Sequence, residues 1–113
     1  MLKKLRTSAK NSIFGLRAAF KADYSFKLEC LVIIFFAVTL LFLNISYGRK
    51  LAMIASLLVV ICVELINTAI EKLADRLVPE YDIQIKFVKD VASAAVLVAI
   101  TIAILVFAFC ILV

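Results

Sequence analysis

Three long apolar runs constrain the fold of this chain more than any other feature. They cover residues 28–47, 51–70 and 91–113, within a chain of 113 residues. Each run is close to the ~20 residues that an α-helix needs to cross ~30 Å of hydrocarbon. The chain is 66% apolar, well above the roughly half that is usual for soluble domains. We therefore predict an all-α membrane protein with three transmembrane helices in a single membrane domain, residues 1–113.

The segment before the first apolar run predicts a helix on the membrane surface. Apolar side chains recur in residues 1–27 at spacings of three and four, which is the period of an amphipathic helix: Leu2, Leu5, Ala9, Ile13, Leu16, Phe20 and Tyr24. Lys3, Lys10, Arg17 and Lys21 fall largely off this stripe. A basic helix with an apolar face lies in the interface plane of a bilayer. Packing against a soluble partner is the alternative.

The basic residues also predict the orientation in the membrane. Of the 13 Lys and Arg, seven precede the first run, two lie between the first and second runs, and four lie between the second and third. The positive-inside rule then places the N-terminus in the cytoplasm and the C-terminus outside. The net charge of +5 is explained by residues flanking the spans, where anionic headgroups attract them. No nucleic-acid partner is therefore predicted.

Two short segments should connect the spans. Gly48, Arg49 and Lys50 predict a tight connection between the first two. Residues 71–90 predict a helical extension and a loop on the cytoplasmic side. Pro79 should end the second helix, because the residue before a proline is biased away from helix.

The composition limits the available chemistry. The chain has no histidine, so the usual physiological base and the commonest metal ligand are missing. Its three cysteines are scattered in apolar runs and support neither a disulfide framework nor a zinc site. With two glycines, there is no glycine-rich phosphate loop. Acid–base or metal chemistry must use carboxylates.

The second apolar run carries one polar stripe. Glu64, Asn67, Glu71 and Asp75 fall within an arc of roughly 80° on a helix. A carboxylate inside the membrane is costly and is by default a candidate for function. A structural polar contact between helices is the alternative for Glu64. Other polar residues flank the same interface, at the starts of the first and third spans: Asp23, Glu29, Lys89, Asp90 and Ser93.

These residue types fit phosphoryl transfer. Carboxylates and substrate phosphates together suit Mg²⁺, a half-buried carboxylate can remove a proton from an alcohol, and lysines can offset phosphate charge. A small proton-coupled transporter is a competing hypothesis, although transporters place their carboxylates near the bilayer midplane. A purely structural membrane subunit would leave the polar stripe unexplained.

The segment Glu64-Leu65-Ile66-Asn67-Thr68-Ala69-Ile70-Glu71, followed by Asp75, resembles the signature of the prokaryotic diacylglycerol kinase family. The resemblance extends through nearly the whole chain in the right order. It includes Gly15–Phe20 upstream, then Glu80-Tyr81, and Lys89–Leu97.

This resemblance implies a homotrimeric enzyme of the bacterial inner membrane that transfers the γ-phosphate of MgATP to a lipid hydroxyl at the cytoplasmic interface. It implies Glu64 as general base, with Asn67 and Asp75 as orienting groups. Glu71 and Asp23 would bind Mg²⁺. Nucleotide contacts are implied for Lys89 and Asp90 and also for Lys4, Asn11, Asp23, Glu71, Glu80, Tyr81 and Asp82. Lipid-substrate contacts are implied for Glu64, Arg17, Glu29 and Ser93.

The chain departs from the family pattern at three of these positions. Asp23 stands where much of the family has a glutamate, so a shift of the helix or a bridging water is needed. Asn11 replaces an aromatic residue near the nucleotide, and Asp82 stands where some members have histidine. Some relatives phosphorylate undecaprenol instead of diacylglycerol. The segments Gly15–Phe20, Asp75-Arg76 and Ser93–Leu97 are more similar to the diacylglycerol-specific branch.

Overall fold

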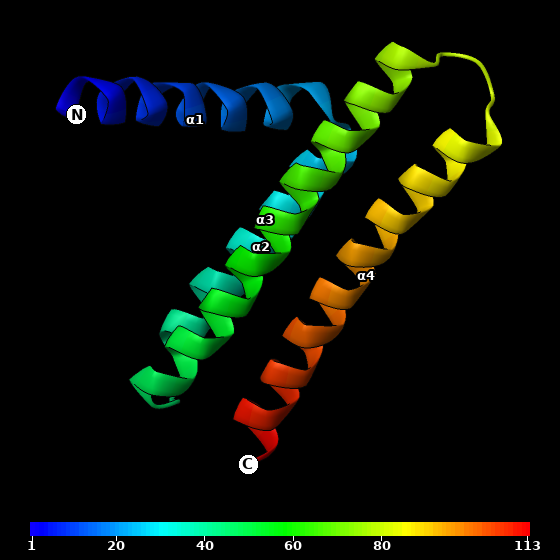
Figure 1. The fold of residues 1–113 in the computed structure, drawn as a ribbon. Coiled ribbons are helices and arrows are strands. Elements are labelled where there is room, and N and C mark those ends of the chain that lie inside the picture. Colours follow the sequence, from blue (N-terminus) through cyan, green and yellow to red (C-terminus); the bar gives the residue numbers. More distant parts are fainter.

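The protein is built from four α-helices and no strands. The computed structural model describes all 113 residues. The helices are α1 (Leu2–Ala22), α2 (Tyr24–Phe42), α3 (Tyr47–Leu77) and α4 (Ile83–Leu112). The last three are long and apolar enough to cross a membrane. They run side by side, and α1 lies across them at the end where α2 begins and α3 finishes (Figure 1). The predicted all-α class with three span-forming helices is confirmed.

The break between α1 and α2 falls at Asp23, so the predicted first helix is five residues too long. Asp23 has extended backbone angles, with φ −121° and ψ 109°. Its Oδ1 accepts hydrogen bonds from the backbone N–H groups of Ser25 at 3.0 Å and Phe26 at 3.3 Å. An aspartate cap of this kind satisfies the first free N–H groups of a helix. It starts α2 four residues before the predicted span.

The connection between α2 and α3 differs from the predicted one. Helix α2 ends at Phe42 and α3 begins at Tyr47, so Gly48–Lys50 lie inside the first turns of α3, and that prediction is wrong. The reason is Ser46, which caps α3 by accepting a hydrogen bond from the N–H of Arg49 at 3.5 Å. Neither glycine of the chain has a positive φ, so no glycine turn is needed here.

The hairpin of α3 and α4 extends beyond the predicted apolar runs. Helix α3 ends at Leu77, two residues before Pro79, as the proline predicted. Asp82 caps α4 by accepting hydrogen bonds from the N–H groups of Gln84 at 2.9 Å and Ile85 at 3.2 Å. As a result α4 begins eight residues before the predicted third span, and the polar residues between 83 and 90 lie on a helix.

The interior of a single subunit is small. Only 12 of the 113 residues are buried, and they include two apolar clusters between the helices. One cluster joins Leu40, Met53 and Cys110, and the other joins Val60, Ala99 and Ala103. The alanines let α4 approach α3 closely, as small residues do at helix contacts in membranes. Most large apolar side chains of α2 and α4 point outward, which suits a chain surrounded by lipid.

Candidate active site

Glu64 lies at one end of an apolar groove between α2, α3 and α4. The groove has a volume of about 500 Å³, and ten of its twelve lining residues are hydrophobic. The two exceptions are Glu29 and Glu64. Glu29 is near the start of α2, and Glu64 is the lining residue of α3 nearest that same end, since the two helices are antiparallel. The groove therefore offers an apolar surface with two carboxylates at one end.

Glu64 is almost fully buried, with 8% of its surface exposed. Burial of this kind is unusual for glutamate unless it is paired, and no lysine or arginine forms an ion pair with it. Instead, the charges of Glu29, Asp23 and Glu71 act on it. A buried acid surrounded by other acids gives no stability of its own. The burial of Glu64 among other acids is therefore better explained by a ligand that binds there than by fold stability.

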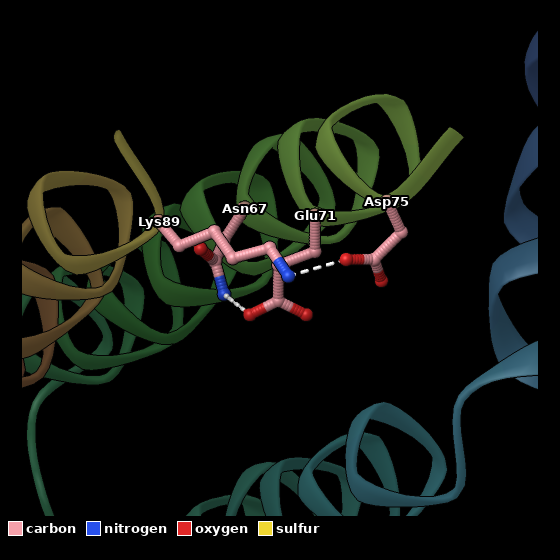
Figure 2. Close-up of polar contacts among 4 residues, drawn as sticks. All are labelled: Asn67, Glu71, Asp75 and Lys89. Carbon is pink, nitrogen blue, oxygen red and sulfur yellow. Dashed lines mark hydrogen bonds and ion pairs between the residues drawn. The ribbon is translucent and has the colours of Figure 1, made fainter. Parts of the chain in front are cut away.

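Three polar residues follow Glu64 along α3, and with Lys89 of α4 they form a cluster of four (Figure 2). The Asn67 amide Nδ2 donates a hydrogen bond to Glu71 Oε1 at 3.2 Å. The Lys89 ammonium, from α4, donates to Asp75 Oδ1 and forms an ion pair with it. Positions four residues apart share one helix face, so Asn67, Glu71 and Asp75 lie in a row along α3. Lys89 then lies across that row and joins α4 to it (Figure 2).

Several polar atoms in this cluster have no partner within the chain. The Asn67 Oδ1 oxygen is buried and accepts no hydrogen bond. The second carboxylate oxygen of Glu71 makes no hydrogen bond either, since only Oε1 is engaged. Buried polar atoms are nearly always satisfied in folded proteins. We interpret the free oxygens as positions that a ligand can fill.

The carboxylates fit a Mg²⁺ ion that arrives with a phosphate ligand. No three Asp, Glu or Cys side chains are grouped closely enough to hold a metal by themselves. Mg²⁺, however, is usually bound by one or two carboxylates together with substrate phosphates and water. Glu71 keeps one free oxygen, and so does Asp23, whose Oδ1 alone is used in the cap of α2. These two residues could hold the ion together with a nucleotide.

The other residues implied by the resemblance are not joined to this cluster. Lys4, Asn11 and Arg17 lie exposed on α1 and make no side-chain hydrogen bond or ion pair. The remaining ones are exposed at the start of α4 or in the connection before it: Glu80, Tyr81, Asp82, Asp90 and Ser93. Asp82 serves as a helix cap. Thus one chain brings together the residues of α3, Lys89 and the groove acids, and leaves the α1 residues apart.

Two sets of contacts were not predicted from the sequence. Lys86 Nζ pairs with Asp90 Oδ2 at 2.6 Å, and the i, i+4 spacing on a helix was the readable signal. At the other end of the bundle, Arg49 Nη1 donates to the carbonyl of Cys110 at 3.1 Å, and Lys50 Nζ donates to the carbonyl of Leu41 at 3.3 Å. The Arg49 contact joins segments 61 residues apart, the Lys50 contact spans the short α2–α3 connection, and no sequence pattern indicates either one.

Three helices long and apolar enough to cross a membrane, a groove with a buried carboxylate and a polar cluster toward the same end define a polytopic membrane protein with a candidate site at one end of its helix bundle. The profile of the family described as "Prokaryotic diacylglycerol kinase" matches residues 10–112. The chain belongs to the prokaryotic diacylglycerol kinase family.

Individual relatives agree with this family assignment. The chain is 35% identical over 91 residues to a protein named diacylglycerol kinase from Escherichia coli (strain K12), covering 80% of this chain and 75% of the relative. It is also 35% identical over 101 residues to proteins of the same name from Pseudomonas aeruginosa and Haemophilus influenzae. Those matches cover 89% of this chain and 82% and 86% of the respective relatives.

Proposed function

We propose that the chain is a lipid kinase that transfers the γ-phosphate of MgATP to the hydroxyl of diacylglycerol and releases phosphatidic acid and ADP. The observation that carries the proposal is the position of Glu64. Glu64 lies at one end of an apolar groove, and the Asn67–Glu71–Asp75–Lys89 cluster lies beyond it toward the end of α3. An apolar substrate and a highly charged one can therefore meet at a single side chain.

The groove supports a lipid substrate. Its lining is apolar except at the Glu29 and Glu64 end, and its volume lies within the range of small-molecule sites, about 300–1,000 Å³. Acyl chains would lie among residues such as Val32, Val60 and Ile104, and the hydroxyl would lie beside the two carboxylates. The same end holds the polar cluster, so the hydroxyl would not have to leave the membrane edge to react.

In the proposed reaction, Glu64 accepts the proton of the lipid hydroxyl. The hydroxyl oxygen bonds to the γ-phosphorus, the bond from that phosphorus to the β–γ bridging oxygen breaks, and ADP leaves with the electron pair. A positioned acid–base group typically contributes about 10²–10⁴-fold to such a step. Lys89 places positive charge near the phosphates, and Asn67 orients Glu71. Most of the remaining catalysis is positioning and charge stabilisation.

Mg²⁺ would be held by Glu71 and Asp23 together with the nucleotide phosphates. When bound, it would neutralise charge on the transferring phosphoryl group. It would also offset the negative charges of Glu29, Asp23 and Glu71 that act on Glu64. A bound cation is often the largest local charge in a site, so it would reduce the repulsion between these carboxylates.

The assembly and orientation belong to the same proposal. We propose a homotrimer, with one membrane domain per subunit and the site end of each facing the cytoplasm, where ATP is available. The small buried interior and the exposed apolar sides of α2 and α4 leave ample surface for contacts between subunits. The implied nucleotide residues Lys4, Asn11, Glu80 and Tyr81, which make no side-chain hydrogen bond or ion pair in one chain, would then surround the bound nucleotide.

The decisive experiment is a product assay in detergent or nanodiscs, without any ion gradient. Purified protein is supplied with Mg²⁺, γ-labelled ATP, and either diacylglycerol or undecaprenol. Label transferred to diacylglycerol is the expected result. Transfer to undecaprenol alone would overturn the lipid assignment and keep the kinase. No transfer to either lipid, with folded protein, would overturn the proposed function.

A further inference from the structure

Helix α1 carries an unusually regular row of cations. Five of its six basic residues recur at spacings of 3, 4, 7 and 4 along the helix, and α1 contains no acidic residue. At ~100° per residue they fall within an arc of about 60°. We call this row the basic stripe: Lys3, Arg6, Lys10, Arg17 and Lys21.

The other faces of α1 show which way the basic stripe points. Small residues of α1 line a groove of about 700 Å³ against α3: Ser12, Gly15, Ala18, Ala19 and Ala22. On a regular helix these positions are centred roughly 150° from the basic stripe. The stripe therefore faces away from the rest of the subunit, and no residue of the chain covers it.

The basic stripe forms no ion pair within the chain, and the N-terminal part of the neighbouring apolar stripe is exposed. The two ion pairs of the structure are Lys86–Asp90 and Lys89–Asp75, and neither involves α1. The N-terminal part of the apolar stripe, about 90° away around the helix, is exposed as well: Leu2 by 82%, Leu5 by 58% and Ile13 by 53%. A helix with adjacent apolar and basic sides lies with one in the acyl region and the other among headgroups.

We propose that the basic stripe of α1 is a docking surface for anionic phospholipid headgroups of the leaflet on which α1 lies. Charge complementarity supports this occupant, because basic segments beside a bilayer are attracted to anionic lipids. The dimensions agree, since the 18 residue steps from Lys3 to Lys21 span about 27 Å of helix. Such a row fits several headgroups side by side better than one nucleotide, and α1 lies across the ends of the spans as a surface helix must (Figure 1).

The absence of tryptophan from the chain provides a direct test. Phe14 is 75% exposed on α1, beside the basic stripe, so Phe14→Trp places a single emitting group there. The full-length variant is reconstituted into vesicles of phosphatidylcholine and phosphatidylglycerol in fixed proportion. Two vesicle samples are compared: in one the phosphatidylcholine carries bromine, which quenches tryptophan emission, and in the other the phosphatidylglycerol does. The brominated lipid has the same mole fraction in both samples. Quenching then reports which lipid is enriched around α1, and it requires no kinase activity.

We expect brominated phosphatidylglycerol to quench at least about twice as strongly as brominated phosphatidylcholine at low salt. At 0.5 M salt the ratio should fall toward one, because the Debye length becomes about 4 Å. In the Phe14→Trp background, changing Lys3, Arg6, Lys10 and Lys21 to Gln should remove the preference. The matched control exchanges Lys for Arg and Arg for Lys at the same four positions, and should keep it.

Three results would overturn the proposal. The first is equal quenching by both lipids at low salt, which needs only the Phe14→Trp variant and so does not depend on the folding of the Gln variant. The second is a preference that survives the four Gln changes. The third is an emission shift produced by ATP in purely zwitterionic vesicles with no response to phosphatidylglycerol, which would assign the basic stripe to nucleotide instead.

Discussion

The two ends of the helix bundle use charged side chains in opposite ways. At the far end, near the α2–α3 connection, Arg49 and Lys50 donate to backbone carbonyls in the last turns of α4 and α2. Such carbonyls have no hydrogen-bond partner within their own helix, so these cations provide the donors that the helix ends lack. At the site end, side chains contact one another and leave carboxylate and amide oxygens free. The difference indicates that only the site end is built to receive something else.

The largest effect should come from Glu64→Gln. This change keeps the shape of the side chain and removes its ability to accept a proton, so diacylglycerol phosphorylation should fall at least ~100-fold, the low end for an acid–base group. The rate of product formation is measured at saturating MgATP. Tyr47→Phe is the control at the far end, where the hydroxyl makes no hydrogen bond, and it should act like the parent protein. Near-normal activity of Glu64→Gln would remove Glu64 from the role of base.

The next effect concerns the metal. Glu71→Gln can still accept the hydrogen bond from Asn67 but loses the charge that binds a cation. The Mg²⁺ concentration for half-maximal activity should rise about 10–100-fold, the range for disturbed metal sites. Asn67→Ala is the matched variant, because it keeps the charge and removes only the orienting contact, and its shift should be smaller. If Asn67→Ala shifts the Mg²⁺ requirement more than Glu71→Gln does, orientation matters more than charge.

The far end should respond in stability and not in activity. Arg49→Gln removes a partly buried hydrogen bond from a charged donor, and the free energy of unfolding should fall by about 1–2 kcal/mol. Lys50→Gln removes an exposed one, at a cost below about 1 kcal/mol. Unfolding is followed by circular dichroism in mixed micelles of increasing denaturing-detergent content. Turnover per folded molecule should stay unchanged in both variants, and a loss of turnover would show that the two ends are coupled.

The sequence predicted the parts that one helix determines by itself. The polar stripe from Glu64 to Asp75 follows from helix periodicity alone, and the end of α3 follows from Pro79. Contacts between helices depend on how the helices cross. The shared groove of Glu29 and Glu64 could therefore not be derived from sequence spacing.

Helix boundaries were the weaker predictions because single capping residues decided them. Asp23, Ser46 and Asp82 each fix the first turn of a helix. Aspartate and serine are recognised capping residues, but at Asp23 and Asp82 the sequence pointed equally to a role in the site. The positions of Lys4, Asn11 and Arg17 relative to the site remain a prediction, since one chain does not bring them into contact with it.

Asp23 is an exception to the difference between the two ends of the bundle. Its replacement should have the smallest effect on the Mg²⁺ requirement and on stability. Asp23 lies at the site end, yet its Oδ1 caps α2 as a structural residue would. Asp23→Asn keeps an oxygen that can cap and removes the charge, so the free energy of unfolding should change by less than about 0.5 kcal/mol. If the second oxygen reaches Mg²⁺ through a water, the Mg²⁺ requirement should rise only about threefold. Asp23→Ala should add a loss of about 1 kcal/mol in stability, because the cap itself is removed. If Asp23→Asn leaves the Mg²⁺ requirement unchanged, Asp23 belongs with Arg49 and Lys50 among the residues that complete helices, and Glu71 alone carries the metal.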